Sequence, residues 1–438
     1  MPAHDNDYAA AVTALFDRQP NRMVPDLDRI RDLAELLGHP EQAYPVIHVT
    51  GTNGKTTTSA MIAALLGALG LSAGTYTSPH LQDVRERIRV AGEPVDRETI
   101  ASGLAYLQPF LEQVDAAHPD PVTFFEVLTA LAFVHFADAP VDVGVLEVGM
   151  GGRWDATNIA HAQVAVLTDI SLDHPELGAG LADIAREKSG IIKPDTLTVT
   201  AAQPEAAAAI IDQAAREAGG RLVVAGRDFG LIDRRAAVGG QHLHLRGVTG
   251  EISDVYLPLH GLHQAANAAY ALAAVEAFLG FAGGIDPDVI REGFAAVRSP
   301  GRLEVIRFDG QAPVILDGAH NPAGIASLAV ALANEFAFRH RVVVLGVLGD
   351  KDLDAMVAQL SPVADHVVVT QAPSERAASA EQLEKVVRAA GLSVETADTV
   401  SEALDLARGL AADTDAVVVT GSLYTVGAAR DALGLDPA

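Results

Sequence analysis

The sequence predicts an α/β protein with two domains, from its length, its apolar runs and one break in its pattern. At 438 residues the chain is long for a single core. Short runs of β-branched residues alternate with longer stretches rich in Ala and Leu, which is typical of strands joined by crossover helices. A Pro-Gly pair at residues 300–301 then interrupts the helical pattern. We therefore expect a first domain over residues 1–298 and a smaller one over residues 299–438.

The expected strands are short and apolar enough to be buried on both faces of a mostly parallel sheet. They cover residues 46–50, 143–148, 164–168, 197–200, 342–345, 367–370 and 416–420. A further strand, 303–308, is expected to open the second domain. Residues 221–259 alternate polar and apolar side chains and include several glycines, so we expect antiparallel strands added to the first domain. Residues 206–215 are rich in alanine and predict a helix.

Composition and charge exclude several classes of protein. No apolar run approaches the roughly 18 residues of a membrane span, and the first twenty residues do not resemble a secretion signal. We therefore expect a cytoplasmic protein with no membrane partner. The net charge of −26 opposes a general attraction to nucleic acid. Because the chain has no cysteine, a metal ion would have oxygen or imidazole ligands, which favours Mg2+.

A phosphate-binding loop is predicted where the first strand passes through a glycine turn into a helix. Gly51 and Gly54 let the backbone approach an anion, and the N–H groups at the start of the helix point toward it. Lys55 adds a charge near the β- and γ-phosphates, and Thr56 or Thr57 can reach Mg2+. Only two residues separate the glycines, whereas the usual Walker pattern has four. An ordinary glycine turn with a surface lysine is the alternative.

Three further polar positions lie where α/β proteins bind ligands. Glu147 ends an apolar strand, and the carboxyl ends of parallel strands border the ligand crevice. It can hold Mg2+, or it can be a strand-end carboxylate that faces water. His174 follows another strand in the same way, although a lone histidine there is more often structural. Lys188, from the residues alone, is a solvated lysine at the end of a helix.

Eight motifs occur in order along the chain and together are highly specific: TGTNGKT (50–56), TSPHL (77–81), GGRWDATN (151–158), REKSG (186–190), SPGR (299–302), LDGAHNP (316–322), GDKD (349–352) and GSLY (421–424). The chain resembles, through them, the folylpolyglutamate and dihydrofolate synthase family, a branch of the Mur-type amide ligases. The resemblance implies a P-loop mononucleotide-binding domain with a mostly parallel sheet and a smaller, Rossmann-like α/β C-terminal domain.

The resemblance also implies an ATP site and two Mg2+ sites. Ser78 and Glu147 would hold one ion and His174 the second, which Lys188 would join as N6-carboxylysine, because carbamylation turns its amine into a carboxylate. Two rather than three residues separate Asp-His from Leu-Gly here, which is a departure from the family at His174. The implied catalytic residues are Lys55, Lys188 and His320. The implied ATP contacts are Thr52, Asn53, Gly54, Lys55, Thr56, Thr57, Asn267, Arg302 and Asp317.

Two segments resemble the pterin-binding segments of the family: Thr123, Phe124, Phe125 and Glu126, and Trp154, Asp155 and Ala156. Arg87 is a further candidate for the pterin or folate site, from the spacing of the arginines rather than from the resemblance. Phe124 and Phe125 can instead be ordinary core residues. Three arginines at positions 85, 87 and 89 alternate at strand spacing, so we expect them to share one face of a strand, either as an exposed basic strand or as a receptor for an acidic substrate.

The implied reaction is the ATP-dependent addition of L-glutamate to dihydropteroate, to folate mono- or polyglutamates, or to both. It proceeds through an acyl phosphate and belongs to folate biosynthesis and one-carbon metabolism. We expect a monomer acting on small molecules. Three alternatives stay open: a Mur-type peptidoglycan ligase, a P-loop nucleotide-binding switch protein, and a non-catalytic nucleotide-binding module.

Overall fold

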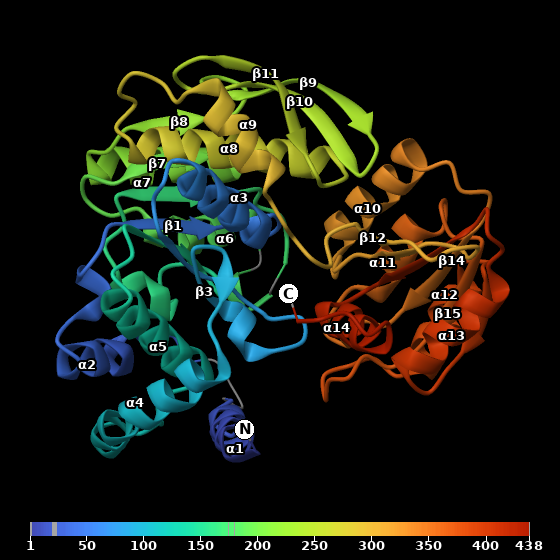
Figure 1. The fold of residues 1–438 in the computed structure, drawn as a ribbon, viewed down its shortest axis with the longest axis horizontal. Coiled ribbons are helices and arrows are strands. Elements are labelled where there is room, and N and C mark those ends of the chain that lie inside the picture. The colour runs from blue at the N-terminus through green and yellow to red at the C-terminus, as the bar shows by residue number, and fades with distance from the viewer. Residues whose placement is uncertain (1, 20–23, 174, 179, 438) are drawn as a thin grey trace.

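A computed structural model describes residues 2–19, 24–173, 175–178 and 180–437, and three β-sheets form its framework (Figure 1). The first two sheets lie in the larger N-terminal domain. The third, with its own helices, forms the smaller C-terminal domain at the right of Figure 1. None of the helices in the described part of the chain combines the length and apolar character that a membrane span requires.

The largest sheet has eight strands in the order β4-β3-β2-β5-β1-β6-β7-β8. The six strands from β2 to the β8 edge pair in parallel, whereas β3 and β4 pair antiparallel at the other edge. Parallel strands end at a common edge, so the loops after β1, β2, β5 and β6 meet there. The strands are β1 Val46–Thr50, β2 Ala73–Tyr76, β3 Ile88–Val90, β4 Glu93–Pro94, β5 Val143–Glu147, β6 Val164–Leu167, β7 Leu197–Thr200 and β8 Leu222–Val224.

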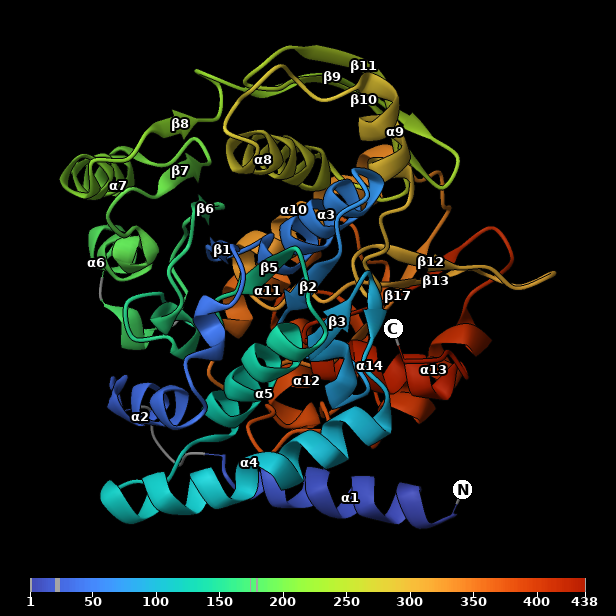
Figure 2. The ribbon, with the colours of Figure 1, turned by 60° about the vertical axis from the view of Figure 1, so that its left-hand side comes forward.

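Helices cover both faces of this sheet. One face packs on α3, α8 and α9, and the other on α2, α4 and α5, while α6 and α7 cover the β6 and β7 end (Figure 2). Helix α1 lies alongside α4. The helices are α1 Pro2–Phe16, α2 Asp28–Leu36, α3 Lys55–Ala68, α4 Arg97–Ala117, α5 Phe124–Asp138, α6 Leu181–Lys188, α7 Glu205–Ala218, α8 Leu262–Phe278 and α9 Pro287–Ala295. Short 3-10 turns are η1 Pro40–Gln42, η2 Val84–Arg87, η3 Ala156–Ile159, η4 Pro175–Leu177 and η5 Ser189–Ile191.

A separate three-stranded antiparallel sheet packs over α8. Its strands, in the order β11-β10-β9, are β9 Gly230–Ala237, β10 Gly240–Arg246 and β11 Glu251–Leu257. Leu243 and Leu245 of β10 are buried in the same apolar cluster as α8. The expected antiparallel strands are therefore present. The expectation was wrong for the first residues of the range 221–259, because β8 extends the main sheet in parallel with β7.

The C-terminal domain is a doubly wound sheet in the order β12-β13-β17-β14-β15-β16. All its pairings are parallel except that of β12 with β13. Helices α10, α11 and α12 cover one face, and α13 and α14 the other. The elements are β12 Glu304–Ile306, β13 Val314–Leu316, α10 Pro322–Glu335, β14 Arg341–Leu345, α11 Leu353–Leu360, β15 His366–Val369, α12 Ala380–Ala389, β16 Ser393–Thr396, α13 Val400–Leu410, β17 Ala416–Thr420 and α14 Leu423–Ala432.

Candidate active site

The glycine turn after β1 is built so that only glycine fits at two positions. Gly51 and Gly54 have φ values of 151° and 86°, in the region that favours glycine. A Cβ on Gly51 would lie 1.8 Å from Oγ1 of Thr168, and one on Gly54 would lie 2.5 Å from Oδ1 of Asn267. Thr168 also donates to the carbonyl of Asn53 over 2.7 Å. The turn is therefore held by Thr168, which follows β6, and by Asn267 of α8.

Two lysine amines converge on the carbonyl of Gly51 in this turn. Nζ of Lys55 donates to it over 3.1 Å, and Nζ of Lys188 over 2.7 Å. Burial lowers the pKa of both amines, and it brings that of Lys188 to about 7. The expectation from the residues alone that Lys188 is solvated is therefore wrong. Lys188, at the end of α6, is 3% exposed and lies against the phosphate loop, residues 50–56.

Glu147 joins the loops on either side of its strand. It ends β5, which lies between β1 and β2 in the sheet. Its Oε1 accepts from the hydroxyl of Thr56 over 2.9 Å, and its Oε2 from the backbone N–H of Ser78 over 3.3 Å. The carboxylate is 1% exposed, and burial raises its pKa to about 7 although nearby Lys55 opposes the rise. It does not face bulk water, which was the alternative left open by the sequence.

His174 lies outside the described residues, but its neighbour Asp173 makes a polar bridge to the C-terminal domain. Asp173 accepts from Nζ of Lys351 over 2.9 Å and from Nδ2 of Asn321 over 3.2 Å. Asn321 also donates to Oδ1 of Asn53 in the glycine turn over 3.1 Å. Neither Lys351 nor Asn321 was predicted as a site residue. Both lie inside motifs quoted above, GDKD and LDGAHNP, and this position could have marked them as candidates.

Asp317 and His320 follow β13, at the edge of the second sheet. Both carboxylate oxygens of Asp317 accept backbone N–H groups, from Leu303 over 2.9 Å and Ala319 over 3.0 Å. Nδ1 of His320 lies 2.9 Å from the carbonyl of Gly318, so it carries the proton and Nε2 is left as an acceptor. Burial lowers the pKa of His320 to about 4, so the ring is neutral at pH 7. Arg302 packs against Gly318, where a Cβ would lie 2.5 Å from its Nη1.

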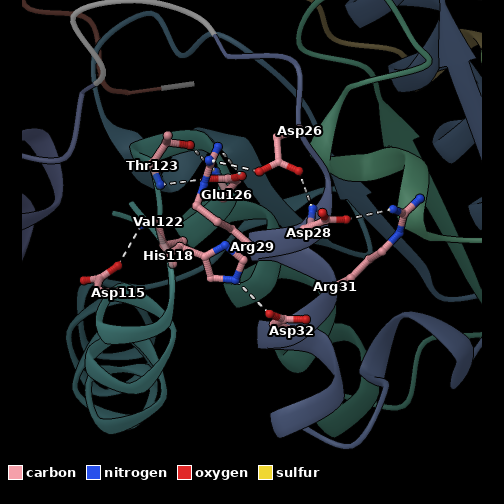
Figure 3. A network of polar contacts seen from close by, with 10 residues as sticks. All are labelled: Asp26, Asp28, Arg29, Arg31, Asp32, Asp115, His118, Val122, Thr123 and Glu126. Atoms are coloured by element: carbon pink, nitrogen blue, oxygen red, sulfur yellow. Dashed lines mark hydrogen bonds and ion pairs between the residues drawn. The ribbon is translucent and has the colours of Figure 1, made fainter. Parts of the chain in front are cut away.

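Thr123 and Glu126 form the start of α5. The hydroxyl of Thr123 caps the helix, and Oε2 of Glu126 accepts the Thr123 N–H over 2.7 Å. Arg29 of α2 forms a buried ion pair with Glu126 over 3.0 Å, and Figure 3 shows its side chain in contact with both Glu126 and Asp26. These contacts give Thr123 and Glu126 a role in the fold. The Thr-x-x-Glu capping spacing was readable in the sequence.

The three arginines at positions 85, 87 and 89 do not share a strand face, so that expectation was wrong. Residues 84–87 form the turn η2, and β3 begins only at Ile88. Arg85 pairs with Asp83 over 3.0 Å, whereas Arg87 turns inward and is 7% exposed. Its Nε donates to Nδ1 of His80 over 2.9 Å, and its guanidinium lies 5.1 Å from the ring centre of Phe124.

The loop after β5 packs against the aromatic residues of α5. A Cβ on Gly149 would lie 2.6 Å from Cζ of Phe125. Asp155 accepts the N–H of Met150 over 3.0 Å and the hydroxyl of Thr157 over 2.5 Å. Ala156 is buried, whereas Trp154 is 48% exposed. Phe125 and Asp155 thus pack on the loop that follows β5, and Phe124 lies beside Arg87.

The comparisons with known proteins agree on one family. Residues 49–275 match the Mur ligase middle domain, and residues 301–423 match the Mur ligase, glutamate ligase domain. The chain is 47% identical to the dihydrofolate synthase/folylpolyglutamate synthase of Mycobacterium tuberculosis, over 95% of this chain and 91% of that protein. It is 34% identical to the protein of the same name from Escherichia coli, over 91% of this chain and 89% of that one.

Solved structures give the same result. Folylpolyglutamate synthase of Mycobacterium tuberculosis complexed with ADP superposes with a TM-score of 0.95 at 45% identity, covering 99% of this chain and all of that one. A complex of FPGS with AMPPCP and folate superposes with a TM-score of 0.86 at 34% identity, covering 97% of this chain and 99% of that one.

Proposed function

The chain belongs to the folylpolyglutamate and dihydrofolate synthase family, and we propose that it joins L-glutamate to both dihydropteroate and folate glutamates. It is an ATP-dependent, amide-forming ligase of the Mur type that attaches glutamate to a folate-type acid. The observation that carries the proposal is Glu147, which accepts from Thr56 beside the glycine turn and from Ser78 at the start of the loop that carries Arg87. Both acceptors are proposed because several relatives are named for both activities.

ATP would bind between the two domains, with its phosphates over the turn at residues 51–54. The backbone N–H groups at the start of α3 and the charge of Lys55 suit an anion there. Arg302 would neutralise charge from the C-terminal side. Asp317 would act indirectly, because its two backbone contacts fix the chain next to Arg302 and His320. Asn267 would keep the turn in shape through its contact with Gly54.

The residues around Glu147 fit Mg2+. A buried carboxylate whose pKa is raised to about 7 gains most from a cation beside it, and the hydroxyl of Thr56 already lies within hydrogen-bond distance. Mg2+ usually takes one or two carboxylates together with phosphate and water oxygens, so few protein ligands are needed. The ion would neutralise charge on the transferring phosphoryl group. We propose Glu147 and Ser78 for the first site, and His174 with a modified Lys188 for the second.

Lys188 suits carbamylation because a neutral amine is the form that adds carbon dioxide. With its pKa lowered to about 7, about half of the amines are neutral at pH 7, whereas an ordinary lysine is almost wholly charged. The new N–C bond releases one proton and leaves a carboxylate. That carboxylate would replace a buried cation beside Lys55 with an anion, which removes a repulsion between the two side chains.

The acceptor acid would lie between Arg87 and the loop after β5, with its ring system near Phe124, Phe125 and Asp155. Its carboxylate oxygen would attack the γ-phosphorus, and ADP would leave. The amine of glutamate would then attack the acyl carbon, phosphate would leave, and the amine would lose one proton. His320 would accept a hydrogen bond through Nε2 and position the amine, since its low pKa makes it a weak base.

Product analysis tests the acceptor. Purified protein is incubated with ATP, Mg2+ and glutamate, together with either dihydropteroate or tetrahydrofolate, and the products are weighed by mass spectrometry. We expect each acid to gain one glutamyl residue, or more for the folate. No product from either acid, with ATP consumed instead in the presence of a UDP-linked peptidoglycan precursor, would favour the Mur-type alternative. The division at residue 298, the monomeric state and the cytoplasmic location stay predictions.

A further inference from the structure

The loop between β2 and β3, residues 77–87, is here named the substrate loop. It is organised around one buried carboxylate, Glu86, which is 6% exposed. Glu86 accepts the backbone N–H groups of Leu81 over 2.7 Å, Gln82 over 3.0 Å and Asp83 over 3.0 Å. Three bonds to one side chain fix the turn at the tip of the loop, so a displacement of the tip strains these bonds and acts on Glu86 and on its neighbour Arg87.

The tip of the substrate loop packs directly against helix α14 of the C-terminal domain (Figure 1). A Cβ on Gly427 would lie 2.0 Å from the carbonyl oxygen of Leu81, so the helix and the loop backbone touch without an intervening side chain. The side chain of Leu81 packs on the apolar cluster of the C-terminal domain that includes Val426. A residue of the first domain therefore completes a core of the second.

Polar contacts surround this packing. Nε2 of Gln82 donates to Oδ1 of Asp431 over 2.8 Å and to the carbonyl of Leu435 over 2.9 Å. Its Oε1 accepts from Nε of Arg430 over 2.7 Å. Arg430 is 5% exposed and also pairs with Glu304 of β12. Both the nitrogen and the oxygen of the Gln82 side-chain amide therefore form hydrogen bonds with the C-terminal domain.

The other end of the substrate loop carries groups of the candidate active site. The Ser78 N–H donates to Glu147 over 3.3 Å, and the Thr77 N–H donates to the carbonyl of Arg87 over 2.9 Å. Arg87 in turn holds His80. The loop therefore connects α14 to the carboxylate and the arginine that face the acceptor acid.

We infer that Gly427 and Gln82 are positioning residues for ligation: through them, α14 sets the substrate loop, and with it Ser78 and Arg87, in the geometry that the acceptor acid requires. Neither residue touches a reacting atom. The inference rests on the proposed function for its catalytic part, while the contact between loop and helix stands on its own. The C-terminal domain would thus contribute to acceptor binding from a helix outside the ATP site.

A pair of glycine-to-alanine variants tests the inference. In Gly427→Ala the new methyl group forces the loop and α14 apart. Gly409→Ala is the matched control, because Gly409 lies in the neighbouring helix α13 of the same domain, and among the described residues its added Cβ would meet no atom within 4 Å outside its own helix. We expect Gly427→Ala to lower kcat/KM for the acceptor acid at least tenfold with the KM for ATP changed less than threefold. A kcat/KM within twofold of the control overturns the inference.

A second measurement does not depend on activity. Hydrogen exchange of the amides of residues 81–83 reports whether Glu86 still holds the loop tip. We expect faster exchange in Gly427→Ala and in Gln82→Ala, but not in Gly409→Ala or in Gln213→Ala, whose exposed amide donates to Glu217 of its own helix. Unchanged exchange in both test variants overturns the contact. If the wild-type protein ligates neither acid, the proposed function fails, and exchange still decides whether α14 sets the loop.

Discussion

The phosphate loop, residues 50–56, and the substrate loop, residues 77–87, both lie beside the end of β5, yet different contacts hold them in place. Each approaches β5, and Glu147 gives one carboxylate oxygen to each. The phosphate loop is fixed mainly by its own domain, through Thr168, Asn267 and Lys188. The substrate loop instead has its tip in the core of the C-terminal domain. We therefore expect the shape of the phosphate loop to depend chiefly on the first domain, and that of the substrate loop on how the second domain docks.

The largest effect is expected on the phosphate side, from Lys55→Ala. Removing the amine takes one fixed cation from the proposed site of the transferring phosphoryl group, and we expect ligation to fall at least a thousandfold, or about 4 kcal/mol of transition-state stabilisation. The measurement is steady-state ligation with dihydropteroate, and the unfolding temperature checks the fold. Lys385→Ala, at an exposed lysine of α12, is the control. Full activity of the Lys55 variant would contradict the assignment of the phosphate loop.

A smaller effect, roughly 10- to 100-fold on activity, is expected from Lys188→Ala, since its proposed role is to complete the second metal site. In the wild type, labelled bicarbonate should give a carbamate signal by carbon-13 NMR. Because the pKa of Lys188 is lowered to about 7, the neutral amine is lost as the pH falls below 7, and the signal should fade with it. A signal that persists in Lys188→Ala would show that another amine is labelled.

The smallest effect on activity is expected from Glu335→Gln, which weakens domain docking far from the substrate loop. The side chain of Glu335 of α10 is 2% exposed and contacts Arg234, His260 and the Gly261 N–H, with 2.6 Å between Nη2 of Arg234 and Oε1 of Glu335. We expect the free energy of unfolding to fall by roughly 1–3 kcal/mol, with activity within about threefold of wild type. If activity fell as much as in Gly427→Ala, docking in general, rather than the loop contact, would control the acceptor site.

The pKa of Glu335 determines how its contribution to the stability of the folded state changes with pH. Its partners lower its pKa from 4.5 to about 2, so the carboxylate stabilises the folded state fully above pH 4.5 and loses that effect as the pH falls toward 2. Denaturant unfolding at pH 7 should separate wild type from Glu335→Gln, and the difference should shrink below pH 4.5. Glu375→Gln, at an exposed position, should match wild type at both pH values.

Local patterns predicted the frame of this molecule well. Three expected strands, β1, β7 and β17, have the expected bounds, and β5, β6 and β14 differ by one residue at one end. Strand β15 is shifted by one residue at both ends, and β12 covers only residues 304–306 of the expected 303–308. These runs are apolar because both faces of a parallel sheet are buried, a property that any short window of sequence displays. The glycine turn and the strand-end position of Glu147 follow from the same local rules.

Contacts between distant segments were not predictable in that way. The spacing of Arg85, Arg87 and Arg89 suggested a strand, but Glu86 gathers three N–H groups and draws the chain into a turn. The burial of Lys188 depends on α6 lying against a loop 137 residues earlier. The bridge from Lys351 to Asp173 requires the two domains to dock, which no local pattern encodes.

One exposed ring gives the molecule an optical property of its own. Trp154 is the only tryptophan in the chain, and it lies half-exposed in the loop after β5 that faces the proposed acceptor site. All indole fluorescence therefore originates from this single loop. Its colour and intensity depend on the polarity around the ring, so a ligand that covers Trp154 would change the emission of the unlabelled protein, whereas events confined to distant helices would leave it unaltered.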